Sequence, residues 1–349
     1  MDIYRLYGAM DIRKEKKERP MPQKGEALIR TAYVGMCGSD MPRVIKGEVP
    51  FFPSTIGHEF SAVVEEVGEG VTSLKKGDKV AIAPLLVCGK CKNCIEGNPG
   101  QCINAKFLGL RVPDVGGLAE YNVLPEENLV KCPKDMDLKY AAMAEPVTVA
   151  LHAMNLMHFT PEKPVAIIGA GTIGMLAVQC AHAFGAKTMY VFDVDDRRLM
   201  QAKKFGATHV YNTKSEGYLE KFMEDTDGFG SPQVIEAVGI QDTILLALEI
   251  GSVMCETAII GEVREPVTIP AFNFYRRFSY RQQNLHGVYQ SYTGKFPGKE
   301  FPMAIEMINN GQIQLDELIY CVDKMENLLA RFEEAKTPGK VTGKMIFEF

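Results

Sequence analysis

Four cysteines in one short segment, Cys88, Cys91, Cys94 and Cys102, have the spacing C-x2-C-x2-C-x7-C. The segment is rich in Gly, Asn and Lys, and four thiolates at this spacing can close tetrahedrally around one zinc ion. Four protein ligands leave no coordination position for a substrate. We therefore expect a structural zinc ion that stabilises a lobe over about residues 84–106, and we set aside the alternative of four free surface cysteines.

A second set of metal-binding residue types is spread over three distant segments: Cys37, His58 and Glu145. One thiolate, one imidazole and one carboxylate would leave a fourth zinc position open for water or substrate, as a catalytic site requires. Glu59 adjoins His58 and is expected to ligate transiently or to support the ligands, and Asp40 is placed to orient His58. A lone Cys or His is more often structural, so this interpretation depends on the motifs that accompany the set.

A glycine motif, Gly169-x-Gly171-x-x-Gly174, follows a fully apolar strand and opens a helix. This context is the one that a phosphate-binding turn requires. The glycines let the backbone approach a pyrophosphate, which then lies at the helix N-terminus, where Thr172 and Ile173 begin the helix. The motif predicts a dinucleotide site, and the alternative is an ordinary turn between strand and helix.

Asp193 ends the next expected strand, where a carboxylate accepts hydrogen bonds from the adenosine ribose. A carboxylate also repels a 2′-phosphate, so NAD is favoured over NADP. Arg197 and Arg198 follow closely and could soften this preference. Thr148 is expected either to pack near the nicotinamide ring or to be an ordinary residue of a helix N-terminus.

The elements that must position these residues change character along the chain. Short β-branched runs separated by Gly, Pro and Asp predict a small barrel-like β domain in the first part. From about residue 164, strands and helices alternate, which predicts a doubly wound parallel sheet and an α/β fold. The expected strands are 27–34, 61–67, 78–83, 165–168, 188–194, 209–211, 234–238, 253–260 and 344–349, and the later expected helices include 197–205 and 243–250.

Composition narrows the function classes. A length of 349 residues favours two domains. A net charge of −5 argues against nucleic-acid binding. The chain has no apolar run of the length that a membrane span needs and no signal-peptide pattern. Nine cysteines without an export signal indicate reduced thiols and metal ligation, and so a cytoplasmic protein.

Five motifs resemble those of the zinc-containing medium-chain dehydrogenases, in that family's order and over nearly the whole chain. They are Cys37-Gly-Ser-Asp40, Gly57-His-Glu59, the cysteine segment, Glu145-Pro-Val-Thr-Val-Ala-Leu-His152 and the glycine turn. The resemblance implies a GroES-like β-barrel catalytic domain, residues 1–147 and 285–349, split around a Rossmann cofactor domain, residues 148–284.

The resemblance also implies that Cys37, His58 and Glu145 hold the catalytic zinc, giving two zinc ions and one NAD per chain. A glutamate as third ligand is similar to the sorbitol dehydrogenase branch of polyol enzymes. Alcohol dehydrogenases carry a proton-relay histidine near the position of Pro42. Any relay here must therefore run through Ser39, water or the cofactor ribose.

Within that branch, three segments resemble the galactitol-1-phosphate 5-dehydrogenases: 37–46, 84–88 and 291–298. A phosphorylated substrate would need cations, and Arg43, Lys46 and Lys295 are candidates, with Tyr289 as a further substrate residue. The alternative for each cation is a solvated surface charge.

The implied activity is oxidation of a secondary alcohol of a sugar alcohol or its phosphate to the ketose. Alternatives in the same class are an unphosphorylated polyol or diol, such as sorbitol, xylitol or butanediol, and threonine. A different class is a zinc-stabilised NAD-binding protein without turnover. The resemblance also implies a homodimer or homotetramer.

Overall fold

The computed structural model describes residues 1–289, 292–337 and 339–349, and the chain divides into two compact units. The first unit is Met1–Glu145 with Ser291–Phe349, and the second is Pro146–Gln290. The boundary expected after residue 147 lies inside helix α4 (Ala144–Leu156), and the boundary expected after residue 284 lies inside β15 (Asn284–Gly287). Because β15 pairs with β14, the second unit extends past residue 284.

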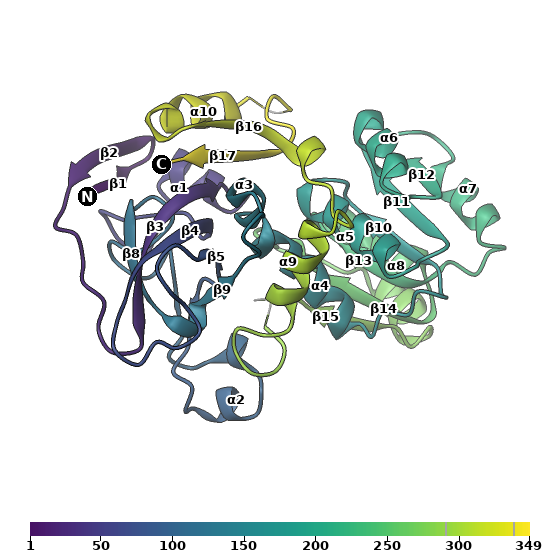
Figure 1. Ribbon diagram of the computed structural model, residues 1–349. Coiled ribbons are helices and arrows are strands. Elements are labelled where there is room, and N and C mark those ends of the chain that lie inside the picture. The colour runs from purple at the N-terminus through teal and green to yellow at the C-terminus, as the bar shows by residue number, and fades with distance from the viewer. Residues whose placement is uncertain (290–291, 338) are drawn as a thin grey trace. The chain divides into compact units, whose positions relative to one another are not determined.

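The first unit is built on a seven-stranded sheet, with the order β16-β17-β3-β4-β5-β9 and β8 paired with β3 (Figure 1). Its strands are β3 (Glu26–Gly35), β4 (Glu59–Val67), β5 (Lys79–Ile82), β8 (Tyr121–Pro125), β9 (Leu129–Lys131), β16 (Ile319–Lys324) and β17 (Lys344–Glu348). Paired residues such as Val34 and Phe60 are buried together, so the sheet forms the core of this unit. The C-terminal strand β17 pairs with β3 and thereby joins the two sequence segments of the first unit in one sheet.

Two short ribbons and several helices complete the first unit. The ribbons are β1 (Asp2–Gly8) with β2 (Asp11–Lys16), and β6 (Leu85–Leu86) with β7 (Lys106–Phe107). The helices are α1 (Asp40–Lys46), α2 (Lys92–Ile95), α3 (Leu138–Ala141), α9 (Glu300–Asn309) and α10 (Leu328–Ala335). Single 3₁₀ turns are η1 (Pro99–Gln101), η2 (Glu126–Asn128), η4 (Asp316–Leu318) and η5 (Met325–Asn327).

The second unit is a six-stranded sheet with the order β12-β11-β10-β13-β14-β15, and all neighbouring strands are parallel. Its remaining strands are β10 (Val165–Ile168), β11 (Met189–Asp193), β12 (His209–Asn212), β13 (Ser231–Glu236) and β14 (Gly251–Ile259). The helices are α5 (Thr172–Ala183), α6 (Asp196–Lys204), α7 (Tyr218–Asp225), α8 (Gln241–Ile250) and the π-helix η3 (Asn273–Ser279). The strand order reverses between β10 and β13, which defines a doubly wound sheet and confirms the predicted fold class.

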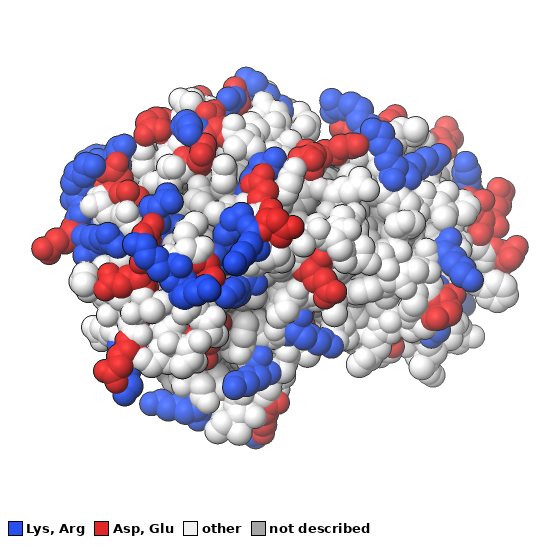
Figure 2. Space-filling view, viewed as in Figure 1, with Lys and Arg blue, Asp and Glu red and all other residues white. Residues whose placement is uncertain are grey.

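Charged side chains of both signs are interleaved over the face shown in Figure 2. Many charged side chains of the protein form close pairs, for example Arg13 with Asp11 at 2.6 Å on the N-terminal ribbon. Within the described ranges, no helix has both the length and the apolar character that crossing a membrane requires.

Candidate active site

The four cysteines of the 84–106 lobe lie together, with their sulfur atoms within 4.8 Å of one another. The Sγ atoms of Cys91 and Cys94 are 3.5 Å apart, as are those of Cys88 and Cys102. Backbone N–H groups of Lys90 and Cys91 lower the pKa of the Cys88 thiol to about 6, because they stabilise its thiolate form. Four thiols in this arrangement fit one tetrahedral zinc ion.

Cys37, His58 and Glu59 form a second compact group, with ligand atoms within 4.8 Å of one another. The antiparallel pairing of β3 with β4 explains the proximity, because Gly35 is the register partner of Glu59. The two loops that leave the sheet at this point carry Cys37 and His58. The His58 ring is 5% exposed and packs on Phe107, with ring centroids 5.2 Å apart.

Glu145, the third ligand expected from the sequence, is not part of this compact group of described residues. It lies in the same electrostatic environment, however. Burial raises the pKa of Glu145 to about 8, and the charges of Glu59 and Cys37 add to the increase while His58 opposes it. The structure thus offers two carboxylates, Glu59 and Glu145, near the thiol and imidazole donors.

A buried lysine that the sequence analysis overlooked contacts this group. Lys344 Nζ donates hydrogen bonds to both carboxylate oxygens of Glu59, at 2.7 and 2.6 Å. Lys344 is 5% exposed and Glu59 is 1% exposed. Burial lowers the pKa of Lys344, but the charges of Glu59 and Cys37 outweigh it, so the pKa is raised overall. The only local signal for this residue is a lysine at the start of the otherwise apolar run 345–347.

Asp40 contacts the Cys37 loop through hydrogen bonds and faces His58. Its Oδ2 accepts the Cys37 N–H at 3.1 Å and lies 3.8 Å from His58 Nδ1, which is buried without a hydrogen-bond partner. Its Oδ1 accepts a hydrogen bond from Arg43 Nη1 at 2.8 Å. Asp40 therefore holds the loop and faces the imidazole at ion-pair distance, and Arg43 is engaged with it. Ser39 lies beside the thiol, since its N–H is 3.5 Å from Cys37 Sγ.

The other expected substrate residues lie away from this group in sequence. Lys295 is exposed, in a segment whose neighbours Tyr292 and Phe296 are buried in a small apolar cluster. Tyr289 follows β15 in the second unit and is 65% exposed. Ser291, which starts the third resembling segment, lies outside the described residues.

The glycine turn of the second unit connects β10 to α5. Gly169 has φ +90°, in the left-handed region that favours glycine, and a Cβ built on Gly174 would lie 1.7 Å from the Gly169 carbonyl oxygen. A Cβ on Gly171 would meet no atom within 4 Å. The turn is therefore tightly closed at Gly174 and open at Gly171, where Thr172 and Ile173 begin the helix. This open cradle fits a pyrophosphate at a helix N-terminus.

Asp193, at the end of β11, is fixed beside this turn. Its Oδ2 accepts the Ala170 N–H at 2.7 Å, and its Oδ1 accepts the Asp195 N–H at 2.9 Å. Arg198 Nη1 lies 3.9 Å from Asp193, whereas Arg197 pairs with Asp195 at 2.8 Å. The two carboxylate oxygens of Asp193 thus hold the turn and the start of α6 in place.

Thr148, the other expected cofactor residue, is fully buried in α4.

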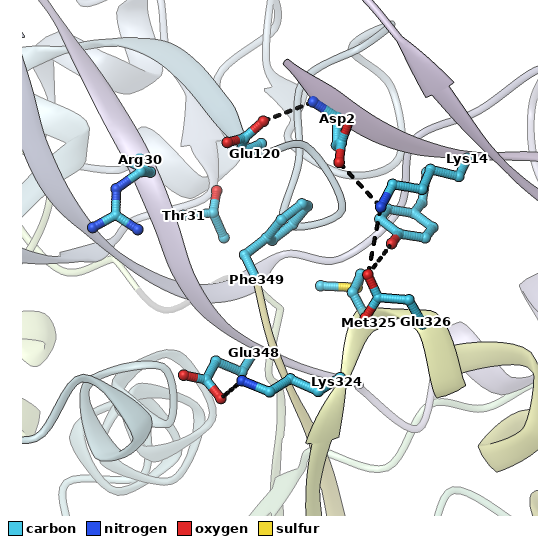
Figure 3. A pocket seen from close by; sticks show the side chains of 11 residues that line it. Asp2, Lys14, Arg30, Thr31, Glu120, Lys324, Met325, Glu326, Glu348 and Phe349 are labelled. Carbon is cyan, nitrogen blue, oxygen red and sulfur yellow. Dashed lines mark hydrogen bonds and ion pairs between the residues drawn. The ribbon is translucent and has the colours of Figure 1, made fainter.

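A cavity of about 260 Å³ in the first unit lies apart from these residues (Figure 3). It contains Lys14, which is 3.1 Å from Asp2 and 3.4 Å from Glu326, and Lys324, which is 2.5 Å from Glu348. Both lysines that line the cavity are paired with acidic side chains, so neither is free to bind a phosphate. It contains none of the site residues expected from the sequence.

Comparisons with known proteins identify the class. Residues 23–134 match the alcohol dehydrogenase GroES-like domain, and residues 172–310 match the zinc-binding dehydrogenase model. The chain therefore belongs to the zinc-binding dehydrogenase family of oxidoreductases, which confirms the predicted family and enzyme class.

Individual relatives show which dehydrogenases the chain is similar to. The chain is 35% identical to galactitol 1-phosphate 5-dehydrogenase of Escherichia coli (strain K12) over 321 residues, which cover 90% of this chain and 91% of that protein. It is 30% identical to D-xylulose reductase A of Aspergillus oryzae, over 92% of this chain and 90% of that protein. The crystal structure of galactitol-1-phosphate dehydrogenase from Escherichia coli superposes with a TM-score of 0.93 at 31% identity, covering 100% of both chains.

Proposed function

We propose that this protein is an NAD-dependent, zinc-dependent dehydrogenase that oxidises a secondary alcohol of a sugar alcohol phosphate, of the galactitol 1-phosphate type, to the ketose. The observation that carries the reaction class is the compact group of Cys37, His58 and Glu59, with Glu145 nearby. The relative at 35% identity supports the substrate class.

Each donor group has a role in this proposal. Cys37 and His58 would hold one zinc ion together with a carboxylate from Glu145, and Glu59 would be available as an exchanging ligand. When bound, zinc would act as a Lewis acid on the substrate alcohol, and NAD would accept the hydride from its carbon. The cysteines of the 84–106 lobe would hold a second zinc ion with a structural role.

The surrounding residues maintain this arrangement. Lys344 holds the Glu59 carboxylate in a two-point contact, which keeps that side chain at one position beside the thiol. Asp40 fixes the Cys37 backbone and carries negative charge toward His58. The Ser39 hydroxyl, on the same loop, is proposed to pass the alcohol proton toward solvent or the cofactor ribose.

On the cofactor side, the open backbone at Gly171 would receive the pyrophosphate, with N–H groups of Thr172 and Ile173 at the helix N-terminus. Asp193 is held by Ala170 and Asp195 and would accept the ribose hydroxyls, which favours NAD. Arg198, at 3.9 Å, would moderate that preference. Thr148 is proposed to pack against the nicotinamide.

A second candidate substrate is an unphosphorylated polyol or diol. The observation that favours it is that the Arg43 guanidinium already donates a hydrogen bond to Asp40. The other expected substrate residues, Lys295 and Tyr289, are exposed. The similarity to D-xylulose reductase A, at 30% identity, supports the same alternative.

Initial rates of NAD⁺ reduction with each sugar alcohol and its phosphate test the proposal. A preference of tenfold or more for the phosphate, about 1.4 kcal/mol of transition-state binding, would support the phosphorylated substrate. Equal or higher rates with free polyols would transfer the assignment to the second candidate. No rate with any polyol, phosphorylated or free, would contradict both.

We also propose that the protein is a cytoplasmic homodimer or homotetramer. The cytoplasmic location is supported by the four thiols of the zinc lobe, because zinc ligation by thiols requires reducing surroundings.

The oligomer is supported by an exposed surface on the second unit. Strand β15 ends its sheet, and large apolar side chains are exposed on β14 and β15 and on η3, including Val253 at 66%, Tyr275 at 62% and Leu285 at 38%. Light scattering of the parent and of Val253→Lys would test this. An oligomer mass that is unchanged in the variant would exclude this surface as the subunit interface.

A further inference from the structure

Glu236, the last residue of β13, is a buried acid to which the proposed reaction assigns no role. It is 0% exposed. Its Oε1 accepts the N–H groups of Val238 at 2.8 Å and Gly239 at 2.9 Å, whereas its Oε2 is buried without a hydrogen-bond partner. No lysine or arginine in the described part of the chain pairs with it.

This arrangement leaves the two carboxylate oxygens in different surroundings. Oε1 is held by two N–H donors, whereas Oε2 is a buried acceptor without a donor. Burial of such an oxygen is unfavourable unless a partner group supplies a donor or a positive charge. Glu236 is therefore suited to stabilise a cation that arrives from outside the chain.

Glu236 also connects the loops at the carboxyl edge of the sheet. Its register partners are Ile168, which directly precedes Gly169, and Ile259. Its backbone carbonyl accepts the N–H groups of Ile260 at 2.8 Å and Gly261 at 3.1 Å. A Cβ at Gly169 would lie 2.4 Å from Val238 Cγ2, so the loop that Glu236 anchors packs against the phosphate turn.

The strand order indicates which half of a dinucleotide would lie on this side. Strands β10 to β12 form the first mononucleotide-binding half of the sheet, and β13 to β15 form the second. A dinucleotide spans the crevice where the order reverses, with its pyrophosphate at the first turn after β10. Glu236 ends the first strand of the second half, which is the nicotinamide side.

We propose that Glu236 determines the preference for the oxidised cofactor: its unpaired carboxylate oxygen stabilises the positively charged nicotinamide of NAD⁺ and not the neutral ring of NADH. This inference rests on the proposed NAD dependence. It assigns to Glu236 a contribution to the relative binding of the two redox forms, separate from the anchoring of the Val238–Gly239 loop.

Calorimetric titrations with NAD⁺, NADH and ADP-ribose, which lacks the nicotinamide, test the inference on the zinc-loaded protein. Glu236→Gln should weaken NAD⁺ binding roughly three- to tenfold, as expected for loss of one nearby charge at an effective dielectric constant of about 20. The affinities for NADH and ADP-ribose should stay within about twofold of the parent. Val238→Ala, the matched control, should leave the ratio of NAD⁺ to NADH affinity unchanged.

Equal weakening of all three ligands would overturn the inference, because Glu236 would then only anchor the loop; unchanged NAD⁺ affinity would overturn it as well. If Glu236→Gln does not fold, Glu236→Asp decides: a ratio close to the parent's supports the charge effect, and a ratio shifted toward NADH contradicts it. Failure of the parent to bind either NAD⁺ or NADH would instead refute the proposed function.

Discussion

Replacing Lys344 by methionine removes the positive charge from the buried pair beside the thiol and imidazole donors. Lys344 contacts both oxygens of Glu59 at 2.6 to 2.7 Å, and the two residues are 5% and 1% exposed. Loss of one member of such a pair leaves the other charge buried and typically costs about 3–5 kcal/mol. We expect a decrease of that size in the free energy of unfolding of the metal-free first unit.

Scanning calorimetry on chelator-treated protein is the appropriate assay, because the two units need not unfold together. The double variant Glu59→Gln/Lys344→Met removes both charges and should be more stable than Lys344→Met alone. Added zinc should stabilise Lys344→Met more than the parent, since a cation returns beside Glu59. A single variant within about 1 kcal/mol of the parent, or a double variant as unstable as the single one, would refute this reasoning.

Four further variants test the cofactor and substrate residues. Gly174→Ala should abolish NADH binding in fluorescence titrations, because its Cβ would lie 1.7 Å from the Gly169 oxygen. Gly171→Ala, whose Cβ meets no atom within 4 Å, should fold normally and weaken NADH binding about tenfold. Normal NADH binding by Gly174→Ala would contradict the tight turn. Asp193→Ala should lower the ratio of kcat/KM for NAD⁺ over NADP⁺ by at least about tenfold, and an unchanged ratio would show that the carboxylate only supports Ala170 and Asp195. Arg43→Ala should raise KM for a sugar alcohol phosphate far more than for the free polyol, and equal effects on both would mean that Arg43 acts through Asp40.

The predictions that succeeded depend on local patterns. The run 27–34 forms most of β3, and the expected helix 243–250 lies within α8, because apolar periodicity and turn residues are properties of neighbouring residues. The glycine motif has the strand-turn-helix context expected for it. Sulfur atoms spaced within one short loop are likewise brought together by the chain itself, as in the 84–106 lobe.

The features that sequence reasoning missed depend on distant pairings. Lys344 reaches Glu59 only because β17 pairs with β3, which in turn pairs with β4. The same register of β3 and β4 places Glu59 in the compact donor group, where the sequence analysis expected it to ligate transiently or to support the ligands. Residue 284 was expected to end the cofactor domain, but pairing of β15 with β14 continues that sheet. Strand register is not encoded in any single segment.

Zinc content per chain tests the central claim most directly, measured by elemental analysis on the parent, Cys37→Ser and Cys102→Ser. Two separate donor groups predict two zinc ions in the parent. Cys37→Ser should lose one of them together with NAD⁺ reduction, while its four-cysteine lobe keeps the other. One zinc ion per chain in the parent, unchanged in Cys37→Ser, would contradict a metal-dependent dehydrogenase and indicate a purely structural zinc protein.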